Sequence, residues 1–176
     1  MELTKALNER RSIRRYTPCQ VTREEIEELV AYAQKAPSWK NSQTARFYVA
    51  LSDEAINTTR EHLASFNTRR TQGVGAYIVT TVVHGISGYD EDGTPTHLNN
   101  GFECFDNGLA VENLILKAHE MGYGTLIMGL YDEGKIREYF KIPEGEQVVV
   151  VIALGKADIE PEMPQRNSID TVLKIF

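Results

Sequence analysis

Four arginines and a serine lie close together near the start of the chain, in the stretch ERRSIRRY at residues 9–16. A guanidinium group presents a planar fork of hydrogen-bond donors that matches a phosphate, and the hydroxyl of Ser12 adds another donor. In an extended segment, Arg10, Ser12 and Arg14 would lie on one side, so three groups could converge on one phosphate. The alternative is a solvated basic loop that pairs with nearby glutamates, and such surface pairs contribute little stability. This motif alone does not decide between the two.

A polar loop, PSWKNSQ at residues 37–43, is the second candidate. Side-chain donors and acceptors in such a loop can read the edge of a heteroaromatic ring, and here they belong to Ser38, Asn41, Ser42 and Gln43. Seen alone, the loop is better interpreted as a polar turn after a helix that Pro37 ends.

Two further segments could border the same ligand. Asn67 and Arg70 would share one face of a helix, although a basic helix end that complements the helix dipole is the simpler interpretation. Glycines punctuate GYGTLIMGL at residues 122–130, where a bare backbone can approach a flat ligand closely. The alternative there is a helix stop followed by a strand and a turn.

Composition narrows the class of protein. The chain has 176 residues and a net charge of −6, which suits a single domain over residues 1–176 and argues against nonspecific nucleic-acid binding. No apolar run is long enough to span a membrane, and the N-terminus lacks a signal-peptide pattern. Cys19 and Cys104 are far apart in the sequence, which favours a reducing cytoplasm. We expect Cys104 to lie in the core and Cys19 to be an ordinary thiol.

Several familiar catalytic and metal motifs are missing from the sequence. GVG at residues 73–75 precedes a strand, so it is no dinucleotide fingerprint, and DEDG at residues 90–93 is too short for a calcium loop. The histidines lack the HExxH spacing, and neither GxSxG nor a P-loop occurs. We therefore expect no metal site and name no catalytic residue.

The hydrophobic pattern predicts alternating helices and strands. Helices are expected over 3–9, 22–36, 53–66, 102–122 and 132–142, and strands over 45–52, 76–83, 124–130 and 147–155. Thr22 and Glu25 form a predicted capping box, and Gly122 suits a helix end. This order indicates one α+β or α/β domain with four strands in one sheet. Residues 84–101 are expected to form a long loop or a lid, and the apolar end of 156–176 to dock on its own core or on a second subunit.

The order of the segments resembles the nitroreductase family of flavin enzymes. The resemblance rests on RRSIRRY, APSWKNSQTARF, DNGLAVENLILKAHEMGYGTLIMG, VVVVIALG and PQRNSIDTVL, and it covers nearly the whole chain. It implies an α+β fold with a central, mostly antiparallel sheet of four to five strands flanked by helices. It also implies an intertwined homodimer that binds FMN at the subunit interface. NADH or NADPH would reduce the flavin, which would then reduce a nitroaromatic, a quinone or a similar small-molecule acceptor by a ping-pong mechanism.

The resemblance also assigns cofactor-binding residues. Arg10, Arg11, Ser12 and Arg14 match the motif for the phosphate, the ribityl chain and, through Arg14, the ring. Three residues match the loop that the partner subunit contributes: Pro37, Ser38 and Asn41. Further matches are Asn67 and Arg70 at the pyrimidine edge, Met128, Gly129 and Leu130 on the N5 side, and Arg166 at the phosphate, with Lys156 as a weaker candidate for that last role.

Two departures from the family pattern leave other functions open. Thr44 and Ala45 replace the usual Pro and aromatic residue after the loop, and the chain is short for the family. A flavin carrier or redox sensor with little turnover is one alternative. Binding of another phosphorylated metabolite, or of a carboxylate patch on a protein, is the other.

Overall fold

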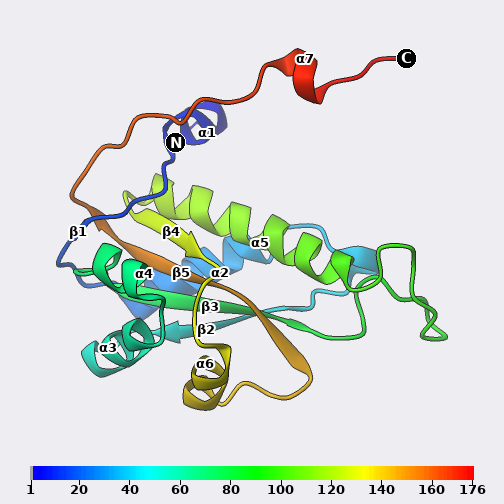
Figure 1. Cartoon of the computed structure of the whole chain (residues 1–176), viewed down its shortest axis with the longest axis horizontal. Helices are drawn as coiled ribbons and strands as arrows, with labels where there is room; N and C mark the ends of the chain where they lie inside the picture. Colours follow the sequence, from blue (N-terminus) through cyan, green and yellow to red (C-terminus); the bar gives the residue numbers. More distant parts are fainter. Residues whose placement is uncertain (1) are drawn as a thin grey trace.

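The computed structural model describes residues 2–176 and has one five-stranded antiparallel sheet (Figure 1). The strands are β1 (Tyr16–Thr17), β2 (Ala45–Ala50), β3 (Ala76–Val83), β4 (Gly124–Met128) and β5 (Glu146–Ala157). The order is β1-β5-β3-β2, and β4 also pairs with β5. The long strand β5 is therefore the centre of the sheet, and the predicted α+β class is confirmed.

Helices cover both faces of this sheet. They are α1 (Leu3–Glu9), α2 (Arg23–Ala33), α3 (Asp53–Glu61), α4 (Ser65–Arg70), α5 (Gly101–Glu120), α6 (Glu133–Phe140) and α7 (Ile169–Val172), with a short 3-10 turn η1 (Trp39–Asn41). None of the helices within residues 2–176 combines the length and the apolar character needed to cross a lipid bilayer.

The alternation of side chains along β3 builds two cores. Tyr77 and Val79 pack with residues of α3 and α6, whereas Ala76 and Ile78 pack on the opposite face with α2 and α5. Successive strand residues point to opposite faces, so every second residue joins the same core. All four of these side chains are fully buried.

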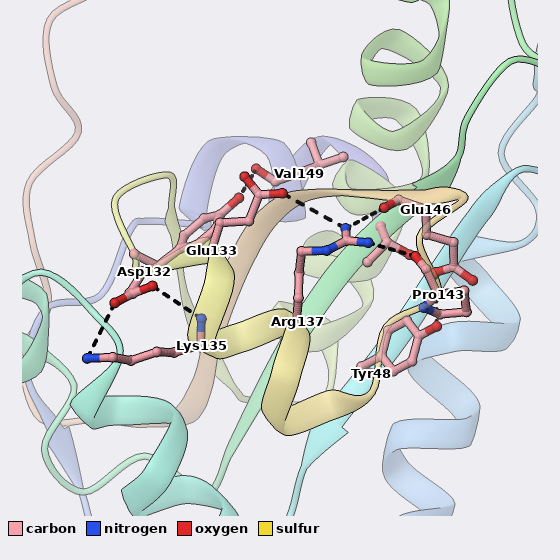
Figure 2. A network of polar contacts seen from close by, with 10 residues as sticks. Tyr48, Asp132, Glu133, Lys135, Arg137, Pro143, Glu146 and Val149 are labelled. Carbon is pink, nitrogen blue, oxygen red and sulfur yellow. Dashed lines mark hydrogen bonds and ion pairs between the residues drawn. The ribbon is translucent and has the colours of Figure 1, made fainter.

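Polar contacts fasten α6 to the start of β5, as Figure 2 shows. The guanidinium of Arg137 donates to the backbone carbonyls of Glu146 and Pro143, at 2.5 and 2.8 Å. The carboxylate of Glu146 accepts hydrogen bonds from Tyr48, at 2.9 Å, and from Thr81. These contacts provide hydrogen-bond partners for partly buried polar groups near the start of β5, and we interpret their role as structural.

Two predictions that depend only on residues adjacent in the sequence are confirmed. Thr22 Oγ1 accepts from the Glu25 backbone, and Glu25 Oε2 accepts from the Thr22 backbone, which completes the capping box. Gly122 follows α5 with φ +77°, a left-handed conformation that glycine adopts without strain.

Three expectations were wrong. The predicted helix 53–66 is broken between α3 and α4, because Leu63 bridges to Tyr131 and the Ala64 N–H donates to Leu130 O at 3.1 Å. The hydrophobic pattern gave four strands and missed β1, which is too short to show any alternation in the sequence, whereas the four to five strands that the resemblance implied are confirmed. Cys104 is exposed, since it lies on the face of α5 that points away from the sheet.

The C-terminal arm, residues 162–176, does not pack on its own core. Every one of these residues is exposed, and the arm leaves the sheet and ends far from it (Figure 1). Its large apolar side chains include those of Ile169, Val172, Leu173, Ile175 and Phe176. Of the two expected docking places, the chain's own core is therefore excluded.

Candidate functional site

The segment that carries the arginine cluster runs beside β4. Ser12 forms a parallel bridge with Thr125, and the Ile13 N–H donates to Thr125 O at 2.9 Å. Gly124 permits this close approach, because a Cβ atom there would lie only 2.5 Å from Ile13 Cγ1. Tyr16 donates to Ile13 O at 2.9 Å, and burial raises the pKa of its hydroxyl, so this donor stays protonated. The segment is thus fixed between two pockets, one at each end.

Arg10 and Arg11 line the first pocket, which we call the Arg10 cleft and which has a volume of about 460 Å³. His119, Gly122 and Thr125 border it as well. Nε of Arg11 and Nε2 of His119 are buried there without a hydrogen-bond partner within residues 2–176. Burial lowers the pKa of His119; the nearby Glu9 carboxylate opposes this shift, and Arg10 and Arg11 reinforce it. Glu9 and Glu160 also line the cleft, and Glu9 lies 3.9 Å from His119 Nε2. The cleft therefore contains buried nitrogen atoms without hydrogen bonds beside two arginines, which suits an anion.

Lys156 lies beside this cleft, whereas Arg166 does not line it. Lys156 Nζ is 3.2 Å from Gly122 O and 3.8 Å from the centre of the Tyr123 ring. Arg166 lies on the exposed C-terminal arm. Within one chain, Lys156 is therefore the better placed of the two predicted cations to supplement Arg10.

Arg14 and Arg70 meet in a second pocket of about 370 Å³, which we call the arginine pocket. The lining residues are Arg14, Arg15, Tyr16, Phe66, Arg69, Arg70 and Gln72. The Arg70 guanidinium lies 5.1 Å from the centre of the Phe66 ring. Arg10 and Arg14 thus line different pockets and do not converge within one chain.

The hydrogen bond from Ala64 to Leu130 sets α4 against the end of β4. It brings the helix that bears Asn67 and Arg70 next to the strand end Met128–Leu130. Asn67 and Met128 are buried, whereas Gly129 and Leu130 are exposed. The predicted ring-edge residues and the predicted N5-side residues are therefore neighbours.

The loop 37–43 borders neither the Arg10 cleft nor the arginine pocket. Pro37 and Ser38 line a third pocket, of about 200 Å³, together with Gln43, Thr44 and Asp106, while Asn41 lies in η1 with φ +56°. Asp106 and His119 mark the two ends of α5, and 13 residues of helix span roughly 20 Å. Ser38 and Arg10 therefore do not border one ligand within a single chain.

Sequence reasoning missed the side chain that holds this loop. Asp106 Oδ2 accepts from the Trp39 N–H at 2.9 Å and from Ser87 Oγ at 2.6 Å. The signal was present, because Asp106 and Asn107 are polar residues on the buried face of an otherwise apolar helix. Thr125 and His119 were also missed; their types and spacing gave no comparable signal.

Comparison with known proteins gives consistent matches. The family model described as Nitroreductase family matches residues 7–83 and 88–156. A Bacillus subtilis protein named "Putative NAD(P)H nitroreductase YdgI" is 30% identical over 98% of this chain and 95% of its own length. A nitroreductase family protein from Clostridium novyi is 25% identical, with a TM-score of 0.76 over 93% of this chain and 89% of that one. An Exiguobacterium sibiricum protein, solved in complex with FMN, has a TM-score of 0.89 at 23% identity, over 100% of this chain and 98% of that one.

Proposed function

Since the chain belongs to the nitroreductase family, we propose that it is an FMN-dependent oxidoreductase that uses NADH or NADPH to reduce small-molecule acceptors. Nitroaromatics, quinones and similar compounds are the proposed acceptors, and the proposed kinetics are ping-pong. In the balanced reaction, NAD(P)H, a proton and the acceptor give NAD(P)⁺ and an acceptor with two added hydrogens. When bound, FMN accepts a hydride from the nicotinamide and passes two electrons to the acceptor.

The Arg10 cleft is the observation that most supports this proposal. Its buried Arg11 Nε and His119 Nε2 have no hydrogen bond within residues 2–176, and His119 Nε2 has only a 3.9 Å ion-pair contact with Glu9, so the cleft fits a phosphate better than an apolar group. Arg10, Arg11 and Lys156 would bind that phosphate. The Ser12–Thr125 crossing would lie beneath the ribityl chain, between the two pockets.

Arg14 and Arg70 would act at the pyrimidine edge of the ring. Negative charge gathers on that edge when the ring is reduced, and a fixed guanidinium there stabilises it without reorganisation. Asn67, one turn before Arg70, would add an amide to the same edge. The exposed backbone of Gly129 would leave the N5 side open to nicotinamide and acceptor in turn.

A homodimer completes the proposed site. Because the Arg10 cleft and the Ser38 pocket lie at opposite ends of α5, two α5 helices packed antiparallel about a twofold axis would bring one chain's cleft to the other's loop. Phe105 on the outer face of α5 is 58% exposed, and the C-terminal arm exposes a further row of apolar side chains. Such apolar surface is typical of an interface. We place the dimer in the cytoplasm, in keeping with two free cysteines.

An absorption spectrum of the purified protein tests this function. We expect a flavin spectrum that bleaches when NADH or NADPH is added without oxygen and returns when an acceptor follows. A flavin spectrum that neither nucleotide bleaches would instead favour a carrier or sensor. A protein without flavin absorbance, even after incubation with FMN, would refute the proposal.

A further inference from the structure

The arginine pocket gathers more positive charge than the proposed flavin site uses. Arg14 and Arg15 come from the N-terminal segment, Arg69 and Arg70 come from α4, and all four are exposed in a chain with a net charge of −6. Within residues 2–176, Arg15 alone among them has an ion pair, at 2.9 Å from Asp158. Four neighbouring guanidinium groups repel one another, and an anion relieves that repulsion.

The FMN phosphate does not account for this pocket. The proposed phosphate site is the Arg10 cleft, and the extended segment from Arg10 to Arg14 spans roughly 13 Å. Arg14 and Arg70 are assigned to the ring edge, and Arg15 is already paired with Asp158. The guanidinium of Arg69 has no hydrogen bond or ion pair in the part of the chain that the structure describes. It is therefore the cation most available to a second anion.

Phe66 gives this anion site a flat apolar wall. It precedes Arg69 and Arg70 by three and four residues on α4, so the ring and both guanidinium groups share one helix face. A phosphate monoester on the ribose of a nucleoside fits such a surface, because the phosphate meets the guanidinium forks while the base stacks on the ring. Of the two proposed reductants, NADPH alone carries such a group near its adenine, the 2′-phosphate.

We propose that Arg69, with Phe66 beside it, binds the 2′-phosphate of NADPH, so that the enzyme uses NADPH in preference to NADH. This inference rests on the proposed function, since it names the reductant of the same site.

The binding test does not depend on turnover. Calorimetry of the protein as purified would compare adenosine 2′,5′-bisphosphate with 5′-AMP, which lacks the 2′-phosphate. We expect the bisphosphate to bind about tenfold to a hundredfold more tightly, as one charge-assisted contact provides. Arg69→Ala should abolish the difference and Arg69→Lys should restore part of it. Arg23→Ala, which removes the same charge from exposed α2, should leave it unchanged. Equal affinities in the unaltered protein, or an undiminished difference in Arg69→Ala, would overturn the inference.

Kinetics separate this inference from the proposed function. With bound flavin confirmed by absorbance, Arg69→Ala should lower kcat/KM for NADPH about tenfold or more and leave kcat/KM for NADH unchanged. A flavin enzyme that uses NADH and NADPH equally well would overturn the NADPH subsite and leave the proposed function intact. A protein that binds no flavin but still binds adenosine 2′,5′-bisphosphate more tightly than 5′-AMP would refute the proposed function and leave the 2′-phosphate site intact.

Discussion

The backbone N–H of Trp39 donates a 2.9 Å hydrogen bond to Asp106 Oδ2, and this bond fastens the loop 37–43 to the first turns of α5. The same carboxylate oxygen accepts from Ser87 at 2.6 Å, so one nearly buried side chain holds two loops. Lys40 and Asp90 add an ion pair at 2.9 Å between those loops. The proposed cofactor loop and the segment 84–101 are therefore one connected structure at this end of α5.

This connection explains how the loop 37–43 keeps a costly backbone. Lys40, Asn41 and Gln43 all have positive φ, at 46°, 56° and 50°. Non-glycine residues adopt this region only where the surroundings impose it, and functional sites often contain such residues. Trp39 provides much of that constraint, because its ring nitrogen also donates to Tyr89 O at 3.2 Å and its ring packs 4.5 Å from that of Phe102.

Asp106→Ala should therefore destabilise the protein by about 2–4 kcal/mol, because a buried donor, Ser87, and a part-buried one, the Trp39 N–H, lose their acceptor. Urea unfolding would measure the change in the free energy of unfolding. Asp106→Asn keeps one carbonyl oxygen and should lose less. Asp92→Ala, which removes an exposed carboxylate from the same loop, should change little. A stability loss in Asp106→Ala no greater than that of Asp92→Ala would show that the contact with Trp39 is incidental.

Arg10→Ala should weaken FMN binding by roughly 2–5 kcal/mol, as expected when one partner of a desolvated charge pair is removed. Quenching of flavin fluorescence on titration into apoprotein would give the dissociation constant. Arg23→Ala, with the same loss of charge, serves as the control. If Arg10→Ala folds normally and binds FMN with unaltered affinity, the FMN phosphate does not bind in the Arg10 cleft.

Protonation of His119 should make the apoprotein less stable in mild acid. Burial lowers the pKa of His119 below its ordinary value of 6.5, so the unfolded chain binds the proton more readily than the folded one. The free energy of unfolding is expected to decrease as the pH falls from above 6.5 through the folded-state pKa. Urea unfolding between pH 5 and 8 would show this, and His119→Gln should flatten the dependence. An equal slope in that variant would assign the effect to other groups. Bound FMN should also reduce the slope, because a phosphate in the Arg10 cleft favours the charged imidazole.

Phe105→Asp should give a monomer that no longer retains FMN, since it puts a charge on the outer face of α5 where the proposed twofold lies. Light scattering with absorbance detection would measure mass and flavin content together. Tyr139→Asp makes the same kind of change on α6, on the other face of the sheet, and should stay dimeric. A Phe105→Asp dimer with full flavin content would place the interface elsewhere.

The sequence predicted most reliably the features that depend on adjacent residues. The capping box of Thr22 and the helix end at Gly122 are local chemistry, and both are found. The sequence did not reveal the break after Glu61, because the break depends on pairing with the chain that follows β4, some 70 residues later: the Ala64 N–H donates to Leu130 O, and His62 O accepts from the Asp132 N–H. Helical propensity is overridden there by tertiary pairing.

In the candidate site as well, the sequence predicted local features but not the contacts between distant segments. The arginine cluster became a predicted anion site only through the family resemblance, and only the fold shows that Arg10 and Arg14 border different pockets and that Arg14 meets Arg70. The resemblance ranked Lys156 below Arg166 as a phosphate ligand, yet Lys156 is the one beside the Arg10 cleft. Proximity across a sheet depends on strand order, and one chain's sequence pattern does not encode that order directly.

Deleting residues 162–176 should leave the fold of each chain intact and dissociate the proposed dimer. All of these residues are exposed, so the chain's own core loses no packing, whereas a partner would lose the apolar side chains of the arm. Circular dichroism would check the fold and light scattering the mass. Replacing Ile169, Val172 and Phe176 with serine in the full-length chain distinguishes loss of apolar contact from loss of length, and it should dissociate the dimer as well. A truncated protein that remains a flavin-loaded dimer would show that α5 suffices for assembly and that the arm covers something else.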